Sequence, residues 1–291
     1  MDRKPRADTP AGPVILPAPS VSHWFGVAFV ALVLAWIIYQ VVTNPGFQWD
    51  IVARYMLHPM VLRGVVTTIE LTAWVMVLGT AIGIVIALMR LSRGRILPLC
   101  AYVFTWFFRG VPVLVQLVFW YNLATLFPTI ALGIPFGGPK FFEVSSTAAI
   151  SSFLAALLGL GLNEAAYMAE IVRAGLLSVD PGQTDAGRAL GYRPAQLFRV
   201  VILPQAMRAI VPPTGNQVIG MLKFTSLASV VALSELMNSV ENIYTRTFET
   251  IPLLIVAALW YLMLVSVLSV VQYFIERYYG RGADDFAGAP V

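Results

Sequence analysis

The chain has 291 residues, of which 58% are hydrophobic and only 12% are charged, and its formal net charge is +4. Soluble domains carry about 25% charged residues, so this composition excludes an ordinary soluble protein and indicates an integral membrane protein. The single cysteine, Cys100, excludes an internal disulfide, and the two histidines lack the spacing of metal ligands, so we expect no metal site.

The first 20 residues contain five prolines and few large apolar side chains, so we expect a flexible tail at 1–20. Trp24 to Val42 follow as an uncharged run of 19 residues. This length is close to the roughly 20 residues with which a helix crosses about 30 Å of hydrocarbon. Because the run is longer than the apolar part of a cleavable signal peptide, we expect an uncleaved signal anchor.

Further apolar stretches are separated by connections that are charged or rich in glycine and proline. They lie at about 64–89, 97–126, 144–175, 213–236 and 251–275. The sequence therefore predicts an all-α membrane protein with about six transmembrane helices and no second folded domain. The largest predicted outer loop runs from Phe127 to Glu143.

Lysine and arginine are distributed unevenly between the two sides of this topology. Thirteen fall in the N-terminal tail, in the 90–95 turn, at 173–208 or near the C-terminal end, and four fall on the other side. Basic residues concentrate in cytoplasmic loops, so both termini and the 173–208 segment are predicted to be cytoplasmic. The basic residues form no patch, and we expect no nucleic acid partner.

A polar stretch, residues 180–204, interrupts the apolar sequence. Asp180 can accept hydrogen bonds from the first free N–H groups of a short helix, and Gly191 can supply the left-handed residue that ends it. Pro194 can open a second short helix, which Pro204 is predicted to close because proline cannot donate to a continuing helix. We therefore expect two short helices here.

The spacing of this stretch resembles the cytoplasmic EAA loop of the membrane subunits of binding-protein-dependent ABC importers. The matching positions are Asp185, Ala186, Gly187, Gly191, Val201, Leu203 and Pro204, with Arg188 beside them. The runs GQTDAGRALG, VILPQAMR, PPTGNQ and LKFTSL are similar to the polar amino acid branch, which carries histidine, glutamine, glutamate, arginine or opines. The resemblance covers about 64–277.

The match departs from the family pattern at three positions. Asp185 stands for the usual Glu, Gly187 for Ala and Val201 for Ile. These changes are mild in size and charge. The literal triplet Glu164-Ala165-Ala166 is not the loop, since the glycine and Leu-Pro spacing does not follow it.

The resemblance implies a type I importer permease of five core helices at 63–278 in the bacterial inner membrane. Residues 21–62 would add an extra N-terminal helix and outer loop, and 279–291 a cytoplasmic tail. The implied partners are two cytoplasmic ABC ATPase subunits that bind ATP and Mg, a second permease that is identical or homologous, a periplasmic or lipid-anchored solute-binding protein, a polar amino acid substrate and membrane lipid.

The chain lacks the Gly-Lys pair of a P-loop, because its three lysines follow Arg, Pro and Leu. We therefore expect no ATP hydrolysis, no catalytic residue and no cofactor in this chain. The polar stretch is interpreted as a docking element for a separate ATPase. The expected coupling residues are Asp185, Ala186, Gly187, Arg188, Gly191, Leu203 and Pro204.

Charged side chains within spans are functional candidates, because a charge at the centre of a membrane helix costs about 2.5–3.5 kcal/mol. With their polar neighbours, the candidates for a substrate pathway are Glu70, Arg109, Asn163, Glu164, Lys223 and Thr225. Glu164 either receives the cation of an amino acid or pairs with Lys223 or Arg109. Arg109, in a run that resembles the family's RG-x-P-x-L-x-Q pattern, either fixes a helix end or pairs with a carboxylate such as Glu70.

Other charged residues have structural interpretations. Glu170 lies three residues before Arg173, so the two are expected to form an ion pair on one helix face. Lys223 and Thr225 belong to a K-x-T-S-L run that recurs in the family, which favours a structural or gating role. Glu235 is expected to be wet near the outer end of its span, or to contact an outer partner.

Two functions of other classes stay open at this point. An ion-coupled secondary transporter would need an inverted repeat or a series of intramembrane carboxylates, and neither is evident. A non-transporting membrane scaffold could use the same loop to dock an ATPase. Uptake driven by an ion gradient would favour the first alternative, and an ATPase that no amino acid stimulates would favour the second.

Overall fold

The computed structural model describes residues 21–133 and 140–280 of the chain. The chain divides into two compact units, residues 1–48 and 49–291, which are described separately. The first contains helix α1 (Val21–Thr43) and a short 3-10 turn, η1 (Pro45–Phe47). Trp24–Thr43 is long and apolar enough to cross a membrane, as predicted. The predicted tail at 1–20 lies outside the described residues.

The second unit is mainly helical, with one small hairpin. Its elements are α2 (Trp49–Met56), α3 (Pro59–Arg90), α4 (Ile96–Gly110), α5 (Val113–Tyr121), α6 (Leu123–Leu126), β1 (Thr129–Gly133), β2 (Lys140–Ser145), α7 (Ser146–Ala149), α8 (Ser152–Leu177), α9 (Pro181–Ala189), α10 (Pro194–Leu197), η2 (Phe198–Ile202), α11 (Leu203–Phe224), η3 (Thr225–Val231), α12 (Leu236–Thr247) and α13 (Thr250–Tyr279).

The helices agree with the predicted membrane class. In addition to α1, helices α3, α8 and α13 are long and apolar enough to span a membrane. Two bent pairs also qualify if each is one span: α4 with α5, bent by 99°, and 194–231 with α12, bent by 46°. The described residues therefore contain four to six candidate spans. The predicted number, about six, agrees with the upper limit of this range.

The expectation of one continuous helix at 97–126 is wrong, because the chain bends sharply after Gly110. Val111 adopts an extended conformation, with φ −89° and ψ 130°. The residue before a proline is disfavoured in the helical region, and Pro112 follows here. The apolar run continues through the bend, so hydropathy did not reveal it.

The expected span at 144–175 begins too early. Residues 140–145 form strand β2, which pairs with β1 in an antiparallel hairpin within the predicted outer loop. Helix α8 begins at Ser152, where the Oγ of Ser151 accepts a hydrogen bond from the N–H of Leu154 at 3.2 Å. Residues 134–139 of the predicted outer loop lie outside the described residues.

Pro204 does not close a helix, contrary to the prediction. The helix that starts at Pro194 continues through η2, which is one π-helical turn, into α11. The N–H of Leu203 bonds to the carbonyl of Phe198, five residues earlier, so the turn that precedes Pro204 is wider than an α-helical turn. The expected span at 213–236 accordingly starts earlier, and its helix is interrupted after Val231, where Ala232 has φ +54°.

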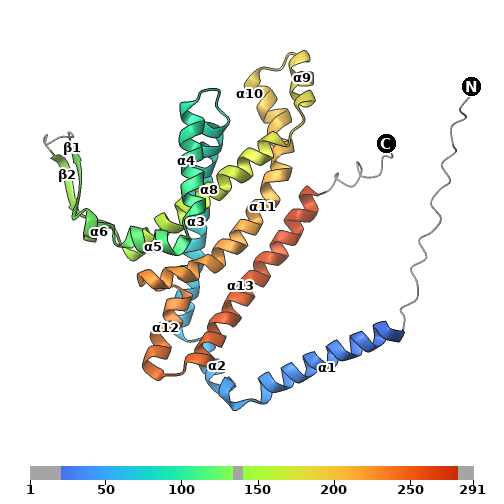
Figure 1. The fold of residues 1–291 in the computed structure, drawn as a ribbon, viewed down its shortest axis with the longest axis vertical. Coiled ribbons are helices and arrows are strands. Elements are labelled where there is room, and N and C mark those ends of the chain that lie inside the picture. The colour runs from blue at the N-terminus through green and yellow to red at the C-terminus, as the bar shows by residue number, and fades with distance from the viewer. Residues whose placement is uncertain (1–20, 134–139, 281–291) are drawn as a thin grey trace, which may run out of the picture. The chain divides into compact units, whose positions relative to one another are not determined.

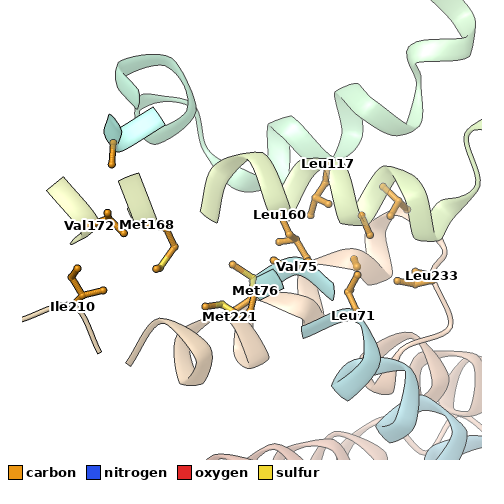
Figure 2. Close-up of a cluster of buried hydrophobic side chains, with 14 of the residues drawn as sticks. Leu71, Val75, Met76, Leu117, Leu160, Met168, Val172, Ile210, Met221 and Leu233 are labelled. Atoms are coloured by element: carbon orange, nitrogen blue, oxygen red, sulfur yellow. The ribbon is translucent and has the colours of Figure 1, made fainter. Parts of the chain in front are cut away.

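The core of the second unit lies between α3, α8 and α11. Figure 2 shows Leu71, Val75 and Met76 of α3 together with Leu160 of α8 and Met221 of α11. A second apolar cluster joins α2, α3, α12 and α13. Small residues let helices in a membrane approach each other closely. Gly79 and Gly83 of α3 lie directly against α8 in this way.

Most connections of this unit lie at one of two ends, whereas the β1–β2 hairpin projects to one side (Figure 1). Figure 1 shows the turn between α3 and α4 at the same end as α9 and α10, and α2 with α12 at the opposite end. The first end therefore carries the arginines of the 90–95 turn and of 188–199, and the other end carries Arg54 and Arg246. This arrangement agrees with the uneven distribution of basic residues in the sequence.

Candidate functional site

Helix α9 begins and ends as the sequence predicts. The Oδ1 of Asp180 accepts a hydrogen bond from the N–H of Gly182 at 2.6 Å, and Pro181 occupies the first turn. At the other end Gly191 has φ +79°. The N–H of Gly191 bonds to the carbonyl of Arg188 at 2.9 Å, and the N–H of Tyr192 bonds to the carbonyl of Gly187 at 3.1 Å. This pair of bonds is a Schellman motif, which ends α9 abruptly and turns the chain into α10.

The two short helices pack on each other through Gly187. Its side-chain position is filled by Leu197 of α10, which is buried, so an added Cβ at residue 187 would collide with the leucine side chain. We call the unit formed by residues 180–197 the knob. Its helices are fixed to one another by this contact and by the Gly191 turn, so a force applied to one is passed to the other.

The knob presents charged side chains and one large apolar side chain to solvent. Leu190 is 76% exposed at the tip. Asp185 and Arg188 are exposed and form an ion pair of 3.3 Å, which contributes little to stability in water. Ala186, Gly191 and Pro204 are also exposed, and Leu203 is half-buried. The knob surface is therefore available for contact with another protein.

Glu164 is buried in the core of the second unit, only 2% exposed. Both of its carboxylate oxygens lie 3.3 Å from the Nε2 of Gln217 on α11. On its other side it packs on Gly79 of α3. Within the described parts of the chain it has no cationic partner, so the expected alternative of an ion pair with Lys223 or Arg109 is wrong.

Asn163 holds the bend between α4 and α5. Its Nδ2 donates to the carbonyl of Phe108 at 2.6 Å. Gln116 supports the same bend, because its Nε2 donates to the carbonyls of Phe108 at 2.9 Å and Val111 at 2.8 Å. Breaking the helix frees these carbonyls, and the two amides satisfy them. Asn163 therefore has a structural role at this bend.

The structure places the remaining pathway candidates apart from Glu164. The guanidinium of Arg109 lies 5.1 Å from the ring centroid of Tyr167, and neither Glu70 nor another carboxylate in the described ranges pairs with it. Glu70 and Lys223 are exposed on α3 and α11. The buried hydroxyl of Thr225 donates to the carbonyl of Leu222 at 2.7 Å, which fits a structural role.

The prediction for Glu170 is confirmed, and the prediction for Glu235 is wrong. The carboxylate of Glu170 lies 2.8 Å from the guanidinium of Arg173. Glu235 is 0% exposed and caps α12, accepting from the N–H groups of Met237 at 2.8 Å and Asn238 at 2.7 Å. It also accepts from the hydroxyl of Tyr261 at 2.9 Å. A carboxylate that accepts these hydrogen bonds can be buried, although Glu235 was expected to be exposed to water.

Sequence reasoning missed Gln217 and Gln116. Both lie in runs that the sequence singled out, PPTGNQ and the RG-x-P-x-L-x-Q pattern, but a search for charged residues passes over an uncharged amide. Among the residues described, no group of three or more His, Cys, Asp or Glu side chains is placed to hold a metal ion.

A profile of the family described as binding-protein-dependent transport system inner membrane component matches residues 79–281. An arginine transport system permease protein, ArgU of Corynebacterium glutamicum, is 41% identical over 288 residues, which are 97% of this chain and 89% of that protein. A probable amino-acid ABC transporter permease protein, YckA of Bacillus subtilis, is 34% identical over 81% of this chain and 98% of that protein.

The fold is also similar to that of a solved amino acid ABC transporter. A crystal structure of an amino acid ABC transporter with histidines contains a chain that superposes with a TM-score of 0.63 and 34% sequence identity. The superposition covers 76% of this chain and 94% of that one. The similarity therefore takes in nearly all of the solved chain.

Proposed function

This chain belongs to the family of inner membrane components of binding-protein-dependent transport systems, and we propose that it is the permease of an ATP-driven importer of polar amino acids whose motor docks on the knob. The family match covers the knob, the C-terminal part of α3 and the core helices α8 and α11, and the curated relatives are amino acid permeases by name. The observation that carries the proposal is the knob, a rigid polar unit on a chain without a P-loop.

The knob is suited to transmit force. Helix α9 is fixed at both ends by backbone and side-chain hydrogen bonds, and Leu197 locks α10 against it. The helix that starts at Pro194 continues into α11 without a flexible link. A movement imposed on the knob by a closing ATPase would therefore tilt α11, which carries Gln217, against Glu164.

The proposed assembly contains two ATPase subunits that bind ATP and Mg, a second permease that is identical or homologous, and a periplasmic or lipid-anchored solute-binding protein. The chain would lie in the bacterial inner membrane with 63–278 as its permease domain. Both termini and the knob would face the cytoplasm, supported by the arginines at the knob end of the second unit.

We propose a cationic amino acid as the first substrate to test. Glu164 is a buried carboxyl group whose hydrogen-bond partner among the described residues is the uncharged amide of Gln217. Burying a carboxylate without a cation is costly, and a cationic substrate would offset that cost. The relative from Corynebacterium glutamicum is an arginine permease by name. When α11 moves, Gln217 would leave Glu164 open to the guanidinium or amino group of the substrate.

The function is tested by reconstitution in proteoliposomes with the partner permease, ATPase and binding protein that co-purify. We expect ATP-dependent uptake of labelled arginine and an ATPase rate that arginine and the binding protein stimulate together. Uptake that needs only an ion gradient would point to a secondary transporter. An ATPase that no amino acid stimulates would point to a scaffold.

Replacing Glu164 with Gln keeps its shape and its contact with Gln217 but removes the charge. Since a hydrogen bond to a charged group contributes about 1.5–3 kcal/mol, we expect the apparent affinity for arginine uptake to fall at least tenfold, with a smaller change for glutamine. Asp50→Asn removes the charge of an exposed carboxylate on α2, outside the candidate pathway, and serves as the control, with near-normal uptake. Equal arginine uptake by Glu164→Gln and the unmodified protein would remove Glu164 from the pathway.

A further inference from the structure

The turn between α3 and α4 has a concentration of positive charge that the proposed transport function does not use. It contains Arg90, Arg93 and Arg95 within six residues and has no acidic residue. Beside it lies a pocket of about 450 Å³. The pocket is lined by Arg90, Tyr102, Thr105, Trp106, Arg109, Gly110, Tyr167 and Glu170.

Arg90 is held in place in this pocket but its hydrogen bonds are incomplete. Its guanidinium lies 4.7 Å from the ring centroid of Tyr102 on α4. Its Nη1 atom is buried and has no hydrogen-bond partner in the described residues, and the same is true of the Oγ of Ser92. Two buried polar atoms without partners at one turn are unusual, because such groups are normally satisfied. A ligand in the pocket would meet a guanidinium whose hydrogen bonds are incomplete.

The charges in the pocket favour an anion. Arg109 stacks on Tyr167 and pairs with no carboxylate in the parts of the chain that are described. The one acidic side chain in the lining, Glu170, is neutralised by Arg173 at 2.8 Å. Two arginines are therefore uncompensated, and planar guanidinium groups bind phosphate oxygens with strong charge-assisted hydrogen bonds.

The surroundings of the pocket are those of a bilayer interface. Arg90 is the last residue of α3, a candidate span of 32 residues. Trp106 and Tyr102 are exposed beside it, and aromatic residues of this kind lie at the level of lipid headgroups. Leu99 on α4 is 62% exposed and offers an apolar surface for an acyl chain.

We infer that this pocket binds the headgroup phosphate of an anionic phospholipid. The phosphate contacts the guanidinium of Arg90, and the acyl chains run along the exposed apolar side chains of α4. Basic pockets between membrane helices bind anionic headgroups in this way. The inference does not depend on the amino acid that is transported.

Native mass spectrometry of the purified complex, exchanged into detergent with phosphatidylglycerol or phosphatidylcholine, tests the inference. We expect phosphatidylglycerol to stay bound to the unmodified protein, and Arg90→Gln to lose at least tenfold in affinity for it. Arg93→Gln makes the same charge change on an exposed arginine outside the pocket lining and is expected to keep the lipid. Assembly with the partner subunits, checked in the same spectra, shows that each variant is folded.

Three results would overturn the inference. The first is that Arg90→Gln assembles and retains phosphatidylglycerol as well as the unmodified protein does. The second is that Arg93→Gln loses the lipid equally, which would mean that general charge attracts it. The third is that inorganic phosphate at millimolar concentration displaces the lipid completely and protects the protein from unfolding to the same extent, which would identify a site for a free anion.

Discussion

Gly191→Val is expected to leave the permease in the membrane and to abolish transport coupled to ATP hydrolysis. Residue 191 has φ +79°, and nothing lies within 4 Å of the place where a Cβ would be added. The effect therefore comes from the backbone, since a side chain in the left-handed region costs roughly 1–2 kcal/mol and a β-branched one is still less favourable. The Schellman bonds of Tyr192 and residue 191 would break, and the angle between α9 and α10 would no longer be fixed by the turn.

Uptake and ATPase rate are measured together in proteoliposomes that contain the assembled complex. We expect uptake to fall at least tenfold while the complex still hydrolyses ATP without stimulation by substrate. Gly191→Asn is the matched control, because asparagine is similar in size to valine but tolerates the left-handed conformation. It is expected to keep most of the coupling. Normal substrate-stimulated uptake by Gly191→Val would contradict the role of the knob.

Gly83→Val is expected to destabilise the core of the permease and to lower its amount in the membrane several-fold. A Cβ at residue 83 would lie 2.6 Å from the Cβ of Met168 and 3.0 Å from the backbone atoms of Ala165 and Ala169 on α8. Backbone atoms cannot move aside as a flexible side chain can, so α3 and α8 would have to separate. Overpacking of this kind costs about 1–3 kcal/mol or more, and such a loss lowers cellular abundance several-fold.

The amount of protein in the membrane and its thermal unfolding in detergent report this effect. Gly26→Val makes the same substitution in α1, where nothing lies within 4 Å of the added Cβ, and is expected to match the unmodified protein. If Gly83→Val accumulates and unfolds like Gly26→Val, the close approach of α3 and α8 is not needed for the fold.

Local features of the fold could be predicted from the sequence because local physics determines them. Asp180 and Gly191 mark the ends of α9 through their own side-chain and backbone preferences. The spans expected at 24–42, 64–89 and 251–275 follow from the length of each apolar run. The Glu170–Arg173 pair is one helical turn apart, so its contact needs no tertiary information. These predictions are confirmed.

Other features depend on contacts between distant segments. Gln217 meets Glu164 across 53 residues of sequence, and the donors that allow Glu235 to be buried include Tyr261 on another helix. The bend at Val111 lies inside an apolar run, where hydropathy does not change. Pro204 was expected to end a helix because the π-helical turn before it cannot be recognised from composition.

Chemical cross-linking from the knob tests the central claim most directly, that an ATPase docks on α9 and α10. In a Cys100→Ser background, Leu190→Cys places one thiol at the 76% exposed tip of the knob, and Phe248→Cys places one at an 88% exposed position beside α12. With a short bifunctional reagent on the assembled complex, we predict that residue 190 is joined to the ATPase subunit and residue 248 is not. An ATPase joined to residue 248, with residue 190 joined to nothing, would contradict the account.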